Sequence, residues 1–263
     1  HNGSRGLGDV YKRQVLNNKS SLKLKLLTSF NAEEESEIKD ELDKVTEQGF
    51  TTIKIKVGKD VNADIKKINN IQTYLNGRVT LRIDANRGYT KKDGCKFVQG
   101  LKPDFIELFE QPCDANDWDA NAAVAKLSHI PIMLDEPICS IKDIEKASKL
   151  KGVGLCKLKL KRFLSITKLT EAIKYAHKLG LKIVLGDGLG TEINCWMEAR
   201  IAKNLIDNAG EYNGFLKIDP KARILSNPLK FKNGFLLTSE NWCLEIDRDK
   251  LEKYSINKEE IYK

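Results

Sequence analysis

The feature that most constrains the fold is a regular alternation of short apolar runs and amphipathic stretches, which starts near residue 22. The short runs are rich in β-branched residues and predict strands at Leu22–Leu27, Thr52–Val57, Val79–Asp84, Phe105–Glu110, Ile130–Asp135, Gly154–Lys159, Lys182–Gly186 and Gly214–Lys217. Apolar residues at helical spacing predict helices at Ala32–Gln48, Asp64–Leu75, Lys91–Gly100, Asp117–Leu127, Ile141–Leu150, Ile166–Leu179 and Ile193–Asp207. Strands separated by helices pair in parallel, because parallel neighbours need a crossover connection. The pattern predicts an α/β fold of the closed (β/α)-barrel, or TIM-barrel, type; an open doubly wound sheet is the alternative, because periodicity does not show closure.

The length of the chain suits one such barrel. It has 263 residues, and barrels of this type contain about 250. We assign residues 15–219 to the barrel. Residues 1–14 lack both the apolar core of a secretory signal and any periodicity, so we expect a non-native leader there. The alternation breaks after Pro220, and residues 220–263, with a short charged helix at Arg248–Tyr254, are expected to pack on the barrel or on a missing partner domain.

Composition excludes several classes of function. Lys and Arg number 45 against 37 Asp and Glu, a formal net charge of +8, but the lysines are spread over many predicted helices. This distribution indicates a solvated surface that suits a small anionic substrate; a non-catalytic protein that binds polyanions is the alternative. Aromatic residues are 7% of the chain, and no apolar run approaches the roughly 18 residues of a membrane span, so we expect neither nucleic acid nor a membrane as partner. The six cysteines form no C-x-x-C pair, which favours a reducing cytoplasm.

Charged side chains stand at the carboxyl ends of consecutive predicted strands, where the active sites of barrels are built. In chain order they are Lys54 and Lys56, Asp84 and Asn86, Glu110, Asp135 and Glu136, and Lys157, Lys159 and Lys161. One strand–helix unit separates each group from the next, so we expect them to converge on one rim. Carboxylates on adjacent strands are desolvated and repel each other unless a cation lies between them.

Asp84, Glu110 and Asp135 therefore form a candidate metal site. Oxygen ligands without His or Cys select a hard cation such as Mg²⁺, with Mn²⁺ as an alternative. Lys54 and Lys56 share one face of their strand, and a second lysine-bearing strand lies opposite across the ring. Neighbouring cations lower the pKa of a lysine, which makes a neutral amine base accessible near pH 7. The opposite lysine is one of three residues of equal strand parity: Lys157, Lys159 and Lys161.

The motifs K-x-K-V-G, D-A-N, E-Q-P and D-E, in this order, resemble the enolase superfamily. Within it they are most similar to the muconate lactonizing enzyme subgroup of the mandelate racemase/muconate lactonizing enzyme family. The resemblance implies a modified (β/α)-barrel and a capping domain, most of which is missing from this chain. It also implies a site of named residues: Asp84, Glu110 and Asp135 as magnesium ligands, Lys56 and Lys159 as opposed acid/base groups, Lys54 as the electrostatic partner of Lys56, and Asn86 and Glu136 beside them.

The resemblance further implies the chemistry. Superfamily members remove a proton α to a carboxylate, and bound magnesium stabilises the ene-diolate that forms. The expected outcome is racemisation or epimerisation, or else cycloisomerisation or β-elimination, of a small carboxylate substrate; a non-catalytic truncated relative is the alternative. The residues also allow a phosphate-binding barrel enzyme that uses the Gly186–Gly190 loop, in which Asp187 and Gly188 are candidate substrate contacts. The sequence is compatible with a homo-oligomer.

Overall fold

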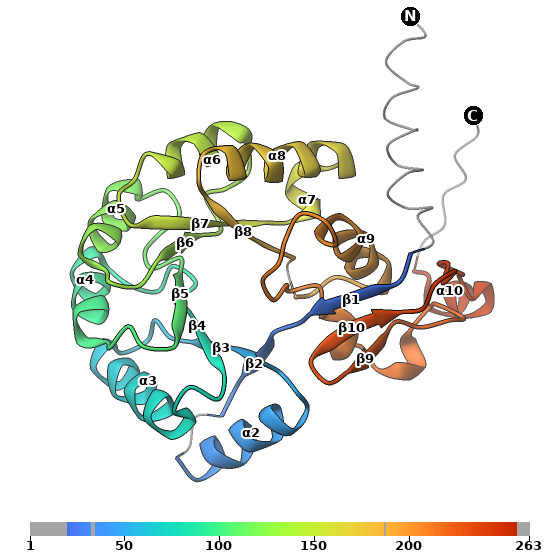
Figure 1. Ribbon diagram of the computed structural model, residues 1–263, viewed down its shortest axis with the longest axis horizontal. Helices are drawn as coiled ribbons and strands as arrows, with labels where there is room; N and C mark the ends of the chain where they lie inside the picture. The colour runs from blue at the N-terminus through green and yellow to red at the C-terminus, as the bar shows by residue number, and fades with distance from the viewer. Residues whose placement is uncertain (1–19, 33–34, 187, 257–263) are drawn as a thin grey trace, which may run out of the picture.

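The computed structural model describes residues 20–32, 35–186 and 188–256, so the predicted leader at residues 1–14 lies outside the described residues. The centre of the molecule is a curled parallel sheet of seven strands in the order β2 to β8 (Figure 1). The strands are β2 (Thr28–Phe30), β3 (Thr52–Lys56), β4 (Thr80–Asp84), β5 (Ile106–Glu110), β6 (Ile132–Leu134), β7 (Val153–Leu158) and β8 (Lys182–Leu185). The predicted barrel-type α/β fold is confirmed.

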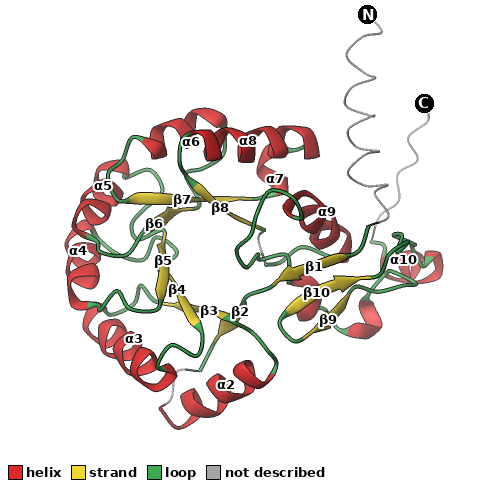
Figure 2. Cartoon of the chain, viewed as in Figure 1, coloured by secondary structure: helices red, strands yellow, loops and turns green. Residues whose placement is uncertain are grey.

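Helices surround the curled sheet, and Figure 2 shows most of them as an outer ring. They are α2 (Glu35–Glu47), α3 (Val61–Leu75), α4 (Lys91–Gly100), α5 (Trp118–Leu127), α6 (Ile141–Ser148), α7 (Leu160–Phe163), α8 (Ile166–Lys178) and α9 (Glu192–Ala202). The side chain of Asp60 accepts hydrogen bonds from the first turn of α3, so this helix begins at Val61 and not at the predicted Asp64. None of the described helices has the length and apolar character needed to cross a membrane.

An irregular segment closes the barrel between β8 and β2. Gly210 forms a parallel bridge with Leu26 on one side. On the other side, the N–H of Glu211 donates to the carbonyl of Leu185 at 2.8 Å. The eighth strand predicted at Gly214–Lys217 is therefore wrong, because those residues form the 3₁₀ helix η1 and the segment around Gly210 takes the eighth position. That segment is too short to show the alternation on which a strand prediction depends.

A second, antiparallel sheet lies beside the barrel (Figure 1). It contains β1 (Leu22–Lys25), β10 (Phe235–Thr238) and β9 (Lys230–Lys232), in that order. The prediction that Leu22–Leu27 forms the first barrel strand is therefore wrong, and β2 has that place. Buried and exposed residues alternate in β1, which is the pattern of a sheet that is covered on one face only.

The C-terminal segment folds back onto the outside of the barrel. Phe231 of β9 stacks on Phe50, just before β3, with the ring centroids 4.9 Å apart. Trp242 contacts Trp196 of α9 at a centroid distance of 6.0 Å. The segment also contains the 3₁₀ helix η2 (Pro220–Ala222), and the helix predicted at its end is present as α10 (Arg248–Tyr254).

The barrel interior has an apolar layer with charged positions above it. A buried apolar cluster from β5 to β8 forms the lower layer: Leu108, Met133, Leu155 and Val184. Arg82 of β4 is in register with Leu108 and is fully buried, with its guanidinium 2.8 Å from Glu107. Side chains two residues further along a strand point to the same face. The next inward positions therefore lie at the carboxyl ends of the strands, directly above the apolar layer.

Candidate active site

Charged side chains occupy the inward positions above the apolar layer. They are Lys54 on β3, Asp84 on β4, Glu110 on β5 and Lys157 on β7, and all of them are buried. The sheet register places Asp84 beside Lys56 on one side and beside Glu110 on the other. The strand ends thus bring together most of the residues that the motifs single out.

Lys54 lies at the centre of an ion-pair network. Its Nζ is 2.9 Å from Asp84 Oδ2, 2.7 Å from Glu110 Oε2 and 3.1 Å from Glu211 Oε1. Burial lowers the pKa of the Lys54 ammonium, but the three carboxylates outweigh this effect and raise the pKa well above its ordinary value. The expectation that neighbouring cations lower the pKa of this lysine is therefore wrong, because carboxylates surround it. Lys54 is a fixed positive charge.

Glu211 completes the network, although it is not among the residues predicted from the sequence. Its Oε1 pairs with the Nζ atoms of both Lys54 and Lys157. Burial raises the pKa of the Glu211 carboxyl, but these two ammonium groups lower it further than burial raises it, well below its usual range. Gly186 has a φ of 108°, and a Cβ there would lie 2.6 Å from the carbonyl carbon of Glu211. Glu211 follows β8 by about one strand–helix unit, and this spacing is a sequence signal for its approximate position, although no local pattern marks the residue.

The structure separates the three lysines of equal strand parity. Lys157 is fully buried on β7 among the carboxylates of the network. Lys159 follows the strand at the rim, where its Nζ lies 2.8 Å from Asp135 Oδ2. Lys161 is exposed on α7. Burial lowers the pKa of Lys157 although the nearby carboxylates oppose the shift, so the direction is the expected one but burial, and not a neighbouring cation, is its main cause.

Lys56 and Asn86 hold the outer side of Asp84. The side chain of Lys56 is 52% exposed, and its Nζ lies 2.7 Å from Asp84 Oδ2. The same ammonium donates to Asn86 Oδ1, while the N–H of Asn86 donates to Asp84 Oδ1 at 2.8 Å. Burial raises the pKa of the Asp84 carboxyl, but the ammonium groups of Lys54 and Lys56 outweigh it and lower the pKa. Asn86 therefore orients both a candidate base and a candidate ligand.

Asp135 follows β6 at the rim and is held by two cations. Lys159 contacts its Oδ2, and Arg162 Nη1 lies 2.8 Å from its Oδ1. Gln111 Oε1 accepts a hydrogen bond from the N–H of Asp135 at 2.9 Å. Burial raises the pKa of the Asp135 carboxyl, but Lys157, Lys159 and Arg162 outweigh it and lower the pKa. Arg162 and Gln111 are additions to the predicted site.

The remaining predicted residues belong to loops above the strand ends. Glu136 pairs with Arg87 at 3.3 Å and so links the loop after β6 to the loop after β4. Asp187 lies outside the described residues. The N–H groups of Gly186 and Gly188 donate to backbone carbonyls of neighbouring segments at 3.0 and 2.8 Å. These two N–H donors are therefore used within the fold and are not free to bind a phosphate.

The donor set fits a hard divalent cation in its chemistry. Asp84, Glu110 and Asp135 are buried carboxylates at the ends of three consecutive strands. Both oxygens of Glu110 are buried without a well-directed hydrogen-bond donor, and burial raises the pKa of its carboxyl to about 7 although nearby lysines oppose the shift. Such a carboxylate gains from added positive charge. Among the described residues, however, no three His, Cys, Asp or Glu side chains lie close enough together to hold an ion. Protein cations contact these carboxylates instead.

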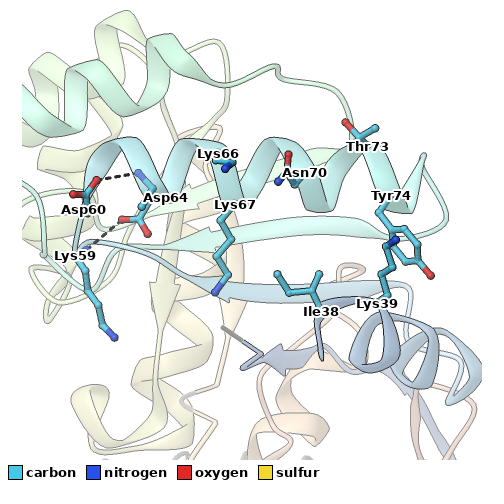
Figure 3. Close-up of a pocket in the computed structure, with 11 residues that line it drawn as sticks. Ile38, Lys39, Lys59, Asp60, Asp64, Lys66, Lys67, Asn70, Thr73 and Tyr74 are labelled. Atoms are coloured by element: carbon cyan, nitrogen blue, oxygen red, sulfur yellow. Dashed lines mark hydrogen bonds between the residues drawn. The ribbon is translucent and has the colours of Figure 1, made fainter. Parts of the chain in front are cut away.

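A groove of ≈ 760 Å³ lies away from this rim, between α2 and α3 (Figure 3). Four lysines line it: Lys39, Lys59, Lys66 and Lys67. Asp60 and Asp64 also line it, but both accept hydrogen bonds from backbone N–H groups at the start of α3 or just before it. The lining contains none of the predicted site residues, so the groove is separate from the charged layer of the barrel.

Comparison with known proteins identifies the family. A family model described as "Enolase C-terminal domain-like" matches residues 37–250. The chain belongs to the enolase superfamily. Among characterised members, the chain is 31% identical over 189 residues to an L-Ala-D/L-Glu epimerase of Clostridium acetobutylicum, which covers 70% of this chain and 49% of that protein. It is 26% identical over 186 residues to an N-succinyl-L-Arg/Lys racemase of Bacillus cereus, and the match covers 70% of this chain and 47% of the racemase.

Solved structures show that this enolase superfamily chain has the fold of the mandelate racemase/muconate lactonizing enzyme family. A family protein from Azoarcus sp. EbN1 superposes with a TM-score of 0.81 at 20% identity, covering 96% of this chain and 72% of that one. Muconate lactonizing enzyme from Pseudomonas putida superposes with a TM-score of 0.80 at 19% identity, and the match covers 89% of this chain and 66% of that enzyme. The chain spans about half the length of the curated relatives it matches.

Proposed function

We propose that this chain is the barrel of an isomerase that removes a proton α to the carboxylate of a small substrate. The layer of lysines and buried carboxylates at the carboxyl ends of the strands is the observation that carries the proposal. Relatives named epimerase and racemase support it. Their names favour racemisation or epimerisation, in which a proton leaves one face of a carbon and another arrives on the opposite face, over cycloisomerisation or β-elimination.

We assign Mg²⁺, or alternatively Mn²⁺, to Asp84, Glu110 and Asp135. When bound, the ion supplies positive charge to the substrate carboxylate, where negative charge develops as the proton leaves. Lys54 contributes a second, permanent positive charge beside Asp84 and Glu110. Because its pKa is raised well above the ordinary value, Lys54 acts as an electrostatic partner and not as the base.

Lys56 and Lys157 are the acid/base pair in this proposal. Lys56 ends β3 and Lys157 stands near the end of β7, four positions apart in a ring of eight, so the two amines approach a bound substrate from opposite sides. Burial lowers the pKa of Lys157, which increases its neutral fraction near pH 7. Lys159 is held on Asp135. We therefore assign the role of the second base to Lys157 in place of Lys159.

Exchange of the substrate α-proton with solvent tests the proposal. L-Ala-L-Glu and N-succinyl-L-arginine, which the names of the relatives suggest, are each incubated with the protein and Mg²⁺ in D₂O and followed by ¹H NMR. We expect the α-proton signal of the substrate to disappear with the wild-type protein and with the exposed control variant Lys161→Ala. With the double variant Lys56→Ala, Lys157→Ala, the signal should persist. Lys159→Ala should slow the exchange less than Lys157→Ala. Exchange that persists in the double variant would overturn the acid/base assignment.

A further inference from the structure

Asp135 differs from the other two proposed ligands in the cations that hold it. The other two share the ammonium of Lys54. Asp135 has a separate cation on each oxygen, with Lys159 Nζ 2.8 Å from Oδ2 and Arg162 Nη1 2.8 Å from Oδ1. Its side chain is only 5% exposed. A cation that reaches this carboxylate from solution therefore finds both of its oxygens in contact with the protein's own positive charges.

Arg162 is held in this position by more than one contact. It lies on α7, the short helix directly after β7. Its Nη1 also donates to the backbone carbonyl of Asp135 and to that of Ile138, the latter at 3.4 Å. The guanidinium thus ties the loop after β6 to α7 while it neutralises the carboxylate. Because a guanidinium stays protonated in proteins, the positive charge beside Oδ1 of Asp135 is permanent.

We propose that Arg162 competes with the divalent cation for Asp135 and must leave the carboxylate before the ion binds there. The inference rests on the proposed function, which places the ion on this residue. Lys159 and Arg162 already place one positive charge beside each oxygen of Asp135, and a divalent ion on the Oδ1 side would add two more charges in contact with the guanidinium, which repels it strongly at a partly buried position. The contact also agrees with the absence, among the residues that the structure describes, of three carboxylates gathered around one point. Metal loading is thus coupled to the release of α7 from the loop after β6.

Removal of the guanidinium should strengthen metal binding. Oδ1 of Asp135 has no well-directed hydrogen-bond donor, but the guanidinium charge lies 2.8 Å from it, so removal of this charge should lower the dissociation constant for Mn²⁺ about tenfold in Arg162→Met. Arg162→Lys retains the charge but loses the planar fork of donors, and its effect should be smaller. Without metal, the melting temperature of Arg162→Met should fall, because the tie between α7 and the loop after β6 is lost.

The experiment titrates Mn²⁺ or Mg²⁺ alone, without substrate, by calorimetry, with free Mn²⁺ also followed by electron paramagnetic resonance. The matched control is Arg78→Met, which removes a guanidinium paired with Asp43 outside the barrel and should leave the affinity unchanged. Added guanidinium ion at millimolar concentration should weaken Mn²⁺ binding to Arg162→Met back toward the wild-type value. A purely structural role of Arg162 does not predict this rescue.

The outcomes separate this inference from the proposed function. If Arg162→Met folds and its Mn²⁺ affinity is unchanged or weaker, the competition is overturned. If Arg162→Met does not fold, Arg162→Gln decides, because it also removes the charge but keeps a hydrogen-bond donor, and an affinity equal to or weaker than that of the wild type overturns the competition. Asp135→Asn tests the metal site itself, because weaker Mn²⁺ binding in that variant supports the assigned ligand. An unchanged affinity in Asp135→Asn overturns the metal assignment, and the competition with it.

Discussion

Glu211 pairs with two buried ammonium groups, so its removal takes away one of the two carboxylates that Lys54 and Lys157 share, the other being Glu110. Breaking a buried ion pair from one side costs about 3–5 kcal/mol, and we expect Glu211→Gln to lower the free energy of unfolding by this amount. Urea denaturation at neutral pH measures the effect. The double variant Lys157→Met, Glu211→Gln should recover part of the loss, because it restores the charge balance. A Glu211→Gln variant as stable as the wild type would show that the other carboxylates, and not Glu211, compensate the charge of these lysines.

Glu110 makes the free energy of unfolding depend on pH, and its contribution falls as the pH rises. Burial raises the pKa of its carboxyl to about 7 in the folded protein, against 4.5 for an ordinary glutamate. The folded state therefore binds this proton more tightly than the unfolded chain, and the resulting stability is present below about pH 4.5 and lost as the pH rises through 7. Without divalent metal, the free energy of unfolding relative to Glu110→Gln should fall by about 2–3 kcal/mol between about pH 5 and pH 8. A difference that rises with pH would contradict the shift.

At the scale of elements, the loop after β8 positions Glu211 through a close backbone approach. Gly186 has a φ of 108°, and an added Cβ would lie 2.6 Å from the carbonyl carbon of Glu211. Gly186→Ala should therefore lower the free energy of unfolding by about 3 kcal/mol, from backbone strain and from the clash together. Gly180 is the matched control, because its φ is 78° but nothing lies within 4 Å of an added Cβ. Equal losses in Gly180→Ala and Gly186→Ala, measured by urea denaturation, would show that the contact with Glu211 is unimportant.

The regular elements were predictable from the sequence, and the irregular ones were not. From β3 to β8 each strand is a short apolar run followed by an amphipathic helix, so the strand ends that carry Lys54, Asp84 and Glu110 could be located by periodicity. Glu211 lies in a segment too short to alternate, and Arg162 lies on a helix of one turn. Neither position has a local pattern, because tertiary contacts and not propensity fix it. The same limit explains why periodicity predicts β1 as a barrel strand, since its true partner β10 is distant in sequence.

At the scale of the whole molecule, the small sheet joins the two ends of the described chain to the barrel. Its strand β9 reaches the barrel through Phe231, whose ring stacks on Phe50 at 4.9 Å. Residues of this sheet, such as Leu22 and Leu236, belong to the same buried cluster as the barrel strands and helices. Because the apolar core is continuous, we expect the small sheet and the barrel to unfold in one cooperative transition.

Phe231→Ala tests this continuity. The ring is partly buried, so its loss should lower the free energy of unfolding by about 2 kcal/mol, less than the 3–5 kcal/mol typical of a fully buried phenylalanine. The transition should stay single when tryptophan fluorescence and circular dichroism are compared, since Trp242 of the C-terminal segment contacts Trp196 of α9. Phe235→Ala is the control, because that ring faces Lys23 within the small sheet. Two separate transitions in the wild type would mean that the small sheet unfolds independently, and the barrel would then have to close without it.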